Sequence, residues 1–133
     1  MAINTTTVTR TPNQLLGLVF GAVYVLVGLV GFAITGADGF AAHDGHKLVF
    51  FEINPLHNIV HIGIGLLLFV AAVRGAATAK AVNSLVGAVY LAVGIVGLFL
   101  TSSEINILAL NHPDNVLHLA SALVLLGTGR AAR

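Results

Sequence analysis

The chain of 133 residues contains no cysteine and very few charged side chains. Without cysteine it cannot form disulfides, thiolate metal sites or covalent haem attachments. Charged residues make up 8% of the sequence and hydrophobic residues 57%, whereas an ordinary soluble domain is about 25% charged. A chain with so little polar surface is expected to lie in a lipid bilayer, so we predict a multi-pass protein of the plasma membrane.

The sequence also lacks a recognisable nucleophile, because no serine is paired with a candidate base and cysteine is absent. We therefore expect a protein that is not an enzyme. The few basic residues are scattered and show no patch for nucleic acid, so the expected partner is the bilayer itself.

Long apolar stretches recur along the chain, and they predict its fold. They cover residues 15–34, 55–73, 81–100 and 113–127. The first three approach the roughly 20 residues that cross a bilayer core, and the shorter fourth would stand upright or thin the membrane locally. Strands are not expected in these stretches, because an open sheet leaves backbone groups unsatisfied in lipid. The prediction is a single all-α membrane domain over residues 1–133, a four-helix transmembrane bundle.

The charges alternate between the connections and predict the orientation. Basic residues without acidic ones occupy the N-terminal tail, the middle connection and the C-terminus: Arg10, Arg74, Lys80, Arg130 and Arg133. Acidic residues, with one lysine, occupy the other two connections: Asp38, Asp44, Glu52, Glu104, Asp114 and Lys47. Because positive segments stay in the cytoplasm, both termini are predicted to be cytoplasmic.

The chain contains an internal repeat. Residues 21–31 return in nearly the same form as residues 87–97, and the segment 54–61 has a counterpart in residues 111–118. Repeat 1 covers about 13–74 and repeat 2 about 80–129. A duplicated helical hairpin places equivalent side chains around a pseudo-two-fold axis, where we expect any chemistry to lie.

Glycines recur on one face of the first and third predicted spans. The spacing of seven and three residues aligns them along a helix, and they are Gly21, Gly28, Gly31, Gly87, Gly94 and Gly97. Small residues let another helix approach closely in lipid, so helix packing is the favoured interpretation. A second interpretation is that the glycines leave room for a flat ligand.

Asparagines mark the starts of the second and fourth spans. Asn54 precedes Pro55 and is well placed to cap a helix. Asn111 stands three residues before Asp114, as in a capping box. Asn58 and Asn115 follow at equivalent positions and complete a polar cluster.

These motifs resemble a known family. Asn-Pro-x-His-Asn-x-x-His opens the second span and Asp-Asn-x-x-His the fourth. Both are similar to motifs in small four-helix actinobacterial membrane proteins that are catalogued as a domain of unknown function. The resemblance runs from about Asn13 to Gly129. It implies a four-helix membrane fold with both acidic connections on one side, and it implies no activity.

Histidines lie at equivalent places in the two repeats. His57 and His61 are four residues apart and share one helix face, as do Asp114 and His118. Pseudo-symmetric packing would bring His61 opposite His118 and His57 near Asp114. Ionisable groups inside a span are costly and are a functional hypothesis by default.

Three interpretations of this cluster remain open. In the first, it is a structural network in which His57 pairs with Asp114 and the deeper histidines hydrogen-bond across the bundle. In the second, it binds a ligand. His57, His61, His118 and Asp114 could hold Zn²⁺ or Cu²⁺, although the positive ends of two helices oppose a free cation. Alternatively, His61 and His118 could ligate a non-covalent haem, with Gly28, Gly31, Gly94 and Gly97 making room for the ring.

The third interpretation is a component that moves protons or small solutes through titrating histidines. As the overall function, the sequence favours a small accessory or assembly protein that presents its glycine faces to other membrane subunits or to itself. That hypothesis depends on glycine faces that remain open to lipid and are not used within the monomer.

Overall fold

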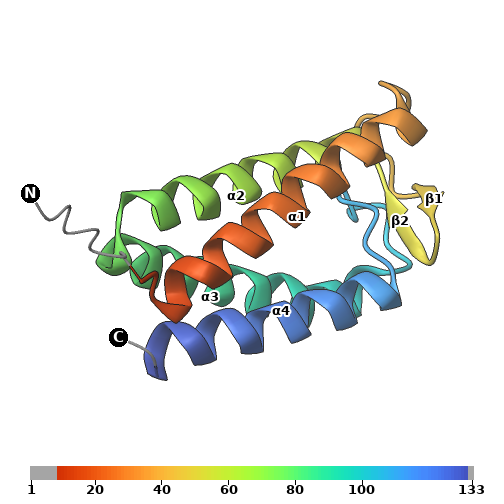
Figure 1. Cartoon of the computed structure of the whole chain (residues 1–133). Coiled ribbons are helices and arrows are strands. Elements are labelled where there is room, and N and C mark those ends of the chain that lie inside the picture. Colours follow the sequence, from red (N-terminus) through yellow and green to blue (C-terminus); the bar gives the residue numbers. More distant parts are fainter. Residues whose placement is uncertain (1–8, 132–133) are drawn as a thin grey trace, which may run out of the picture.

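A computed structural model describes residues 9–131 of the chain. It contains four helices and one small β-hairpin, in the order α1 (Pro12–Thr35), β1 (His46–Leu48), β2 (Phe51–Ile53), α2 (Pro55–Arg74), α3 (Ala76–Leu100) and α4 (His112–Ala131). The helices run up and down, so the start of α1 and the end of α4 lie at one end of the bundle and the β-hairpin at the other (Figure 1). We call these the terminal end and the hairpin end.

The helices confirm the predicted helical membrane fold. Among the described residues, α1, α2 and α3 are long and apolar enough to cross a bilayer. Helix α4 is not among these three, although the sequence predicted a fourth span there. Its 20 residues include Asp114 in the first turn and Arg130 in the last.

The bundle consists of two tightly packed helix pairs, α1 with α2 and α3 with α4. Glycines allow the backbones to touch. A methyl group on Gly21 would lie 2.7 Å from the carbonyl oxygen of Gly65, and one on Gly87 would lie 2.9 Å from the backbone nitrogen of Leu126. Real side chains do not approach backbone atoms so closely, so each pair is held at a distance that only glycine permits.

The other predicted packing glycines are also used inside the pairs. Gly28 contacts the α2 backbone at Asn58, and Gly31 contacts the side chain of the same residue. In the second pair, Gly94 contacts Leu119 and Gly97 contacts Asn115. The glycine faces are therefore covered by the neighbouring helix of the same chain, and they no longer offer a surface to partner subunits.

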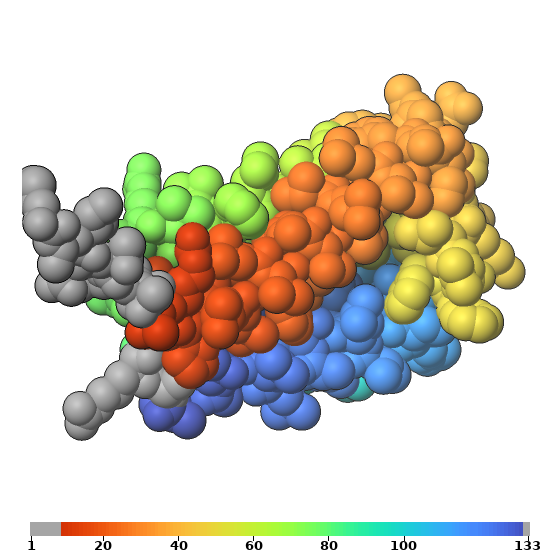
Figure 2. Space-filling view, in the orientation of Figure 1, coloured from red at the N-terminus to blue at the C-terminus, as the bar shows by residue number. Residues whose placement is uncertain are grey.

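Apolar side chains both fill and surround the bundle. Tyr24, Leu68, Val86, Tyr90 and Leu125 form the buried core. The outer faces of the helices also carry large exposed apolar residues, among them Leu26 on α1 and Leu123 on α4. The space-filling view shows α1 crossing the front of the bundle above α4, with the β-hairpin beside both (Figure 2). Such an outer surface suits contact with lipid and not with water.

The β-hairpin adds strands that the helical prediction did not include. His46 pairs with Ile53 and Leu48 with Phe51, around a turn in which Val49 has a φ of 60°. The sequence of this segment is rich in the apolar and aromatic residues that favour strands. Asn111 donates a side-chain hydrogen bond of 2.8 Å to the carbonyl of Phe50, so the β-hairpin is fastened over the start of α4.

The link between α2 and α3 is much shorter than predicted. The sequence placed a connection at residues 74–80, but Gly75 alone, with a φ of 146°, separates the two helices. Residues 76–80 are mostly alanine, which has the highest helix propensity. The apolar stretch marked only the part of α3 that suits lipid, whereas the helix itself begins earlier.

Candidate metal centre

The site lies near the hairpin end, where α2 and α4 begin. Asn54 caps α2: its side-chain oxygen accepts a hydrogen bond of 2.8 Å from the backbone nitrogen of His57. Its amide nitrogen donates to the carbonyls of Ala42 and Ile107. One buried asparagine thus fixes the start of α2 and ties both long connections to it.

Helix α4 begins with a reciprocal capping box. The backbone nitrogen of Asn111 donates to a carboxylate oxygen of Asp114 at 3.0 Å, and the backbone nitrogen of Asp114 donates to the side-chain oxygen of Asn111 at 3.1 Å. The Asp114 carboxylate is therefore turned back toward the start of its own helix.

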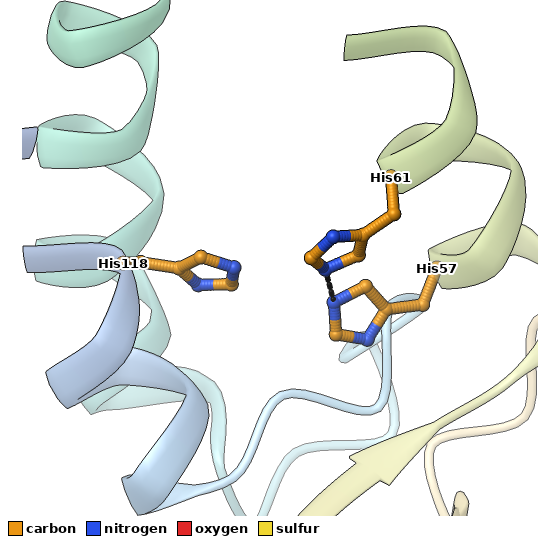
Figure 3. A group of neighbouring side chains, drawn as sticks. All are labelled: His57, His61 and His118. Atoms are coloured by element: carbon orange, nitrogen blue, oxygen red, sulfur yellow. Dashed lines mark hydrogen bonds between the residues drawn. The ribbon is translucent and has the colours of Figure 1, made fainter. Parts of the chain in front are cut away.

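Three imidazoles meet inside the bundle. His57 and His61 project from α2 and His118 projects toward them from α4 (Figure 3). The Nε2 atoms of His57 and His61 are 3.0 Å apart, and each of the three residues offers a ring nitrogen within 4.8 Å of the others. Their side chains are almost fully buried, with exposed fractions of 2%, 6% and 4%.

Asp114 does not join this group, although the sequence placed it with the three histidines as a ligand. The group of close nitrogen donors contains His57, His61 and His118 alone among the described residues. Asp114 and His57 occupy the same position in their helices, three residues after the capping asparagine. The carboxylate accepts the capping hydrogen bond, whereas the imidazole turns inward to His61.

Hydrogen bonds satisfy the histidines only in part, since His57 and His61 share one bond through their Nε2 atoms. The Nδ1 atoms of His61 and His118 are buried and have no hydrogen-bond partner among the described residues. The sequence predicted hydrogen bonds between His57 and Asp114 and across the bundle between His61 and His118. Neither hydrogen bond is present among the described residues. An unpartnered buried polar group costs about 1–3 kcal/mol, so the Nδ1 atoms of His61 and His118 lower the stability of the fold.

Two tyrosines close the site toward the middle of the bundle. Tyr24 packs edge-on against His61, with ring centroids 5.4 Å apart, and Tyr90 packs against His118 at 5.1 Å. The Tyr24 hydroxyl donates to Ser121 at 2.9 Å. The sequence assigned these three residues no part in the site, although Tyr24 and Tyr90 stand at equivalent repeat positions one turn before a packing glycine.

Beyond the tyrosines lies an apolar layer, which separates them from the buried, hydrogen-bonded amides of Asn13 and Asn83 near the terminal end. Leu68, Val86 and Leu125 are buried there and pack in the same cluster as Tyr24 and Tyr90. A relay of protons from the histidines to the terminal end would have to cross this layer. The arrangement gives no support to the transport interpretation.

A haem between His61 and His118 does not fit this packing. The hypothesis needed four glycines to leave space for the ring, but each of them contacts a residue of the neighbouring helix. The enclosed cavity that reaches both histidines, beside Tyr90 and Leu108, has a volume of about 40 Å³. This space suits a single ion or a water molecule, and a porphyrin is far larger.

The remaining two asparagines of the polar cluster lie away from the imidazoles. The side-chain nitrogen of Asn58 donates to the Thr35 hydroxyl of α1 at 3.0 Å. Asn115 lies against Gly97 of α3, as Asn58 lies against Gly31 of α1. Both asparagines therefore belong to the contact inside a helix pair.

Comparisons with known proteins give a family for the chain and no activity. A search of curated proteins and a search of solved structures each found no match. A family model described as a domain of unknown function (DUF4383) matches residues 14–131. That match covers nearly the whole chain, and the chain therefore belongs to the DUF4383 family.

Proposed function

We propose that this membrane protein binds one divalent transition-metal ion, zinc in the first place, through His57, His61 and His118. The observation that carries the proposal is the convergence of three buried imidazoles, each of which offers a ring nitrogen within 4.8 Å of the others. Imidazole is a preferred ligand of zinc, and three histidines form a known zinc ligand set with a fourth position left open.

The spacing of the nitrogens favours this use. Zinc–nitrogen bonds of about 2.0–2.1 Å in a tetrahedral site place neighbouring ligand nitrogens roughly 3.4 Å apart. His57 and His61 are already at 3.0 Å. His118 faces both rings from α4 (Figure 3), with its ring centroid 6.0 Å from that of His57 and 6.3 Å from that of His61, so it would have to move closer when the ion binds.

A negative charge near the site reduces the repulsion that the helix dipoles would exert on a bound cation. The N-termini of α2 and α4 carry partial positive charge. The buried Asp114 carboxylate stands in the first turn of α4, and its negative charge offsets that potential. Three neutral imidazoles can then share a cation without a large net repulsion. By contrast, an accessory role has lost its main support, because the packing glycines are buried within the helix pairs.

Metal analysis of the purified protein tests the proposal. The protein, loaded with Zn²⁺ and dialysed, is expected to retain about one equivalent by elemental analysis, as three histidine ligands imply. His57→Ala should lose the ion. His112→Ala is the matched control and should keep it, because His112 is an exposed histidine of α4 and is not one of the three that converge. If the wild-type protein retains no more zinc than His57→Ala, the proposal is wrong.

We also propose that α4 crosses the membrane and that the hairpin end faces outward. Four basic residues lie at the terminal end, before α1, at the α2–α3 junction and at the end of α4: Arg10, Arg74, Lys80 and Arg130. Arg133, the fifth basic residue of the prediction, lies outside the described residues. The five acidic residues lie at the opposite end, in the two long connections and at the start of α4. This distribution favours a cytoplasmic terminal end.

The absence of cysteine allows a direct test of this topology. In intact cells, a membrane-impermeant maleimide is expected to label Asp38→Cys, in the exposed connection after α1, and not Thr78→Cys, at an exposed position near the start of α3. Lysis should make Thr78→Cys reactive as well. Labelling of Thr78→Cys alone before lysis would reverse the orientation.

A further inference from the structure

An apolar groove opens from the side of the bundle onto the histidines. It has a volume of about 330 Å³ and runs between α1, the β-hairpin and α4. Leu26, Val30 and Leu117 form part of its lining, while His57, His61 and Asp114 are the polar residues that it reaches. It opens on the face where α1, the β-hairpin and α4 meet in Figure 2.

We propose that this groove binds the hydrocarbon chain of a long-chain carboxylate from the bilayer, and that its carboxylate occupies the open position on the metal. The inference rests on the proposed metal site and adds the class of ligand that the site takes. Pockets for small ligands begin at about 300 Å³, so the groove is large enough for part of such a chain.

The lining of the groove indicates entry from lipid. Leu26, Val30 and Leu117 are 61%, 44% and 41% exposed, on the outer surfaces of α1 and α4. The histidines and Asp114 at its inner end are at most 6% exposed. A ligand therefore needs an apolar body to lie along the mouth and a small polar head to reach the metal, which describes a single-chain amphiphile.

The charge of the site selects an anionic head. A divalent ion with three neutral imidazoles and the Asp114 carboxylate has a net charge of about +1, and burying an uncompensated charge is costly. A carboxylate brings the sum to zero, whereas a neutral head group leaves it unchanged. The N-terminal ends of α2 and α4 both lie at the hairpin end of the bundle (Figure 1) and also favour an anion.

Cobalt substitution makes the interaction visible. The protein, loaded with Co²⁺ in nanodiscs of phosphatidylcholine, is titrated with laurate and with acetate while the visible cobalt absorption is recorded. We expect laurate to change the spectrum, and at concentrations at least about tenfold lower than acetate, because each buried methylene adds about fourfold in affinity.

A pair of variants separates the groove from simple partitioning into the bilayer. Leu117→Trp places a large ring in the groove and should weaken the laurate response about tenfold, the loss of roughly two methylene contacts, while the response to acetate stays. Leu123→Trp, on the exposed face of the same helix and outside the groove lining, is the control and should respond as the wild type does.

The outcomes distinguish the two proposals. A protein that binds no Co²⁺ overturns the metal site and this inference together. A protein that binds Co²⁺ but whose spectrum ignores laurate, or in which Leu117→Trp behaves like Leu123→Trp, overturns the groove inference alone.

Discussion

Alanine at Gly21 is expected to separate α1 from α2 and to destabilise the protein strongly, by about 3 kcal/mol, the upper part of the range for overpacking. The new methyl group would lie 2.7 Å from the Gly65 carbonyl oxygen and 2.8 Å from the Phe69 backbone nitrogen. These are backbone atoms, so no side-chain rotation can relieve the clash. Unfolding in mixed micelles with increasing SDS, followed by circular dichroism, measures the loss.

Gly63 provides a matched control on α2. A methyl group there meets no atom within 4 Å among the described residues, and alanine is the better helix former by about 1 kcal/mol. Gly63→Ala should therefore unfold at the same SDS concentration as the wild type, or at a higher one. If Gly21→Ala and Gly63→Ala unfold alike, the backbones of α1 and α2 do not touch as described.

Local signals in the sequence predicted the helices well. Asn54 with Pro55, and Asn111 with Asp114, lie at the start of α2 and α4 because capping depends on residues only three positions apart. Hydropathy was less informative about where the helices begin and end. It placed the start of α3 at residue 81, whereas the helix begins at Ala76, because alanine and threonine continue a helix without being strongly apolar.

The candidate site was only partly predictable, because it depends on how the helices rotate against each other. The spacing of His57 and His61 correctly put both on one face, since i and i+4 always coincide. Repeat symmetry then placed Asp114 with the histidines, as the counterpart of His57. Chemistry broke that symmetry, because a carboxylate can accept the capping hydrogen bond from Asn111 and a backbone-facing imidazole is a poorer substitute.

The role of the glycines also needed the structure. The same glycine spacing is compatible with three roles: the face can pack within the chain, pack on a partner, or leave room for a ligand. Only the position of the neighbouring helix decides between them, and here Gly31 and Gly97 receive Asn58 and Asn115. The tight packing that they permit uses the space a haem would have required.

Leucine at His118 is expected to separate stability from metal binding. Without metal, His118→Leu should be at least as stable as the wild type and up to about 1–3 kcal/mol more stable, the cost of an unpartnered buried polar group. His118 is 4% exposed and its Nδ1 atom has no partner within the described residues. Leucine has a similar size and no polar atom to satisfy.

With zinc bound, the wild type should be more stable than His118→Leu. At a free Zn²⁺ concentration a thousandfold above the dissociation constant, the wild type should gain about 4 kcal/mol, because the ion binds only the folded state. His118→Leu, with one of three ligands removed, should gain almost nothing. Thermal melts followed by circular dichroism, with and without zinc, measure both effects in the same micelles.

The deciding result is whether His118→Leu raises or lowers the stability of the metal-free protein. If the histidines serve only as a structural network, His118→Leu removes a contact that the fold uses, so it should destabilise the metal-free protein and zinc should not stabilise the wild type. If they form a metal centre, the metal-free protein tolerates the cost of burying the His118 imidazole, and the free energy gained when the ion binds outweighs that cost. A variant that is stabilised without zinc and insensitive to it is explained by the metal centre and not by the network.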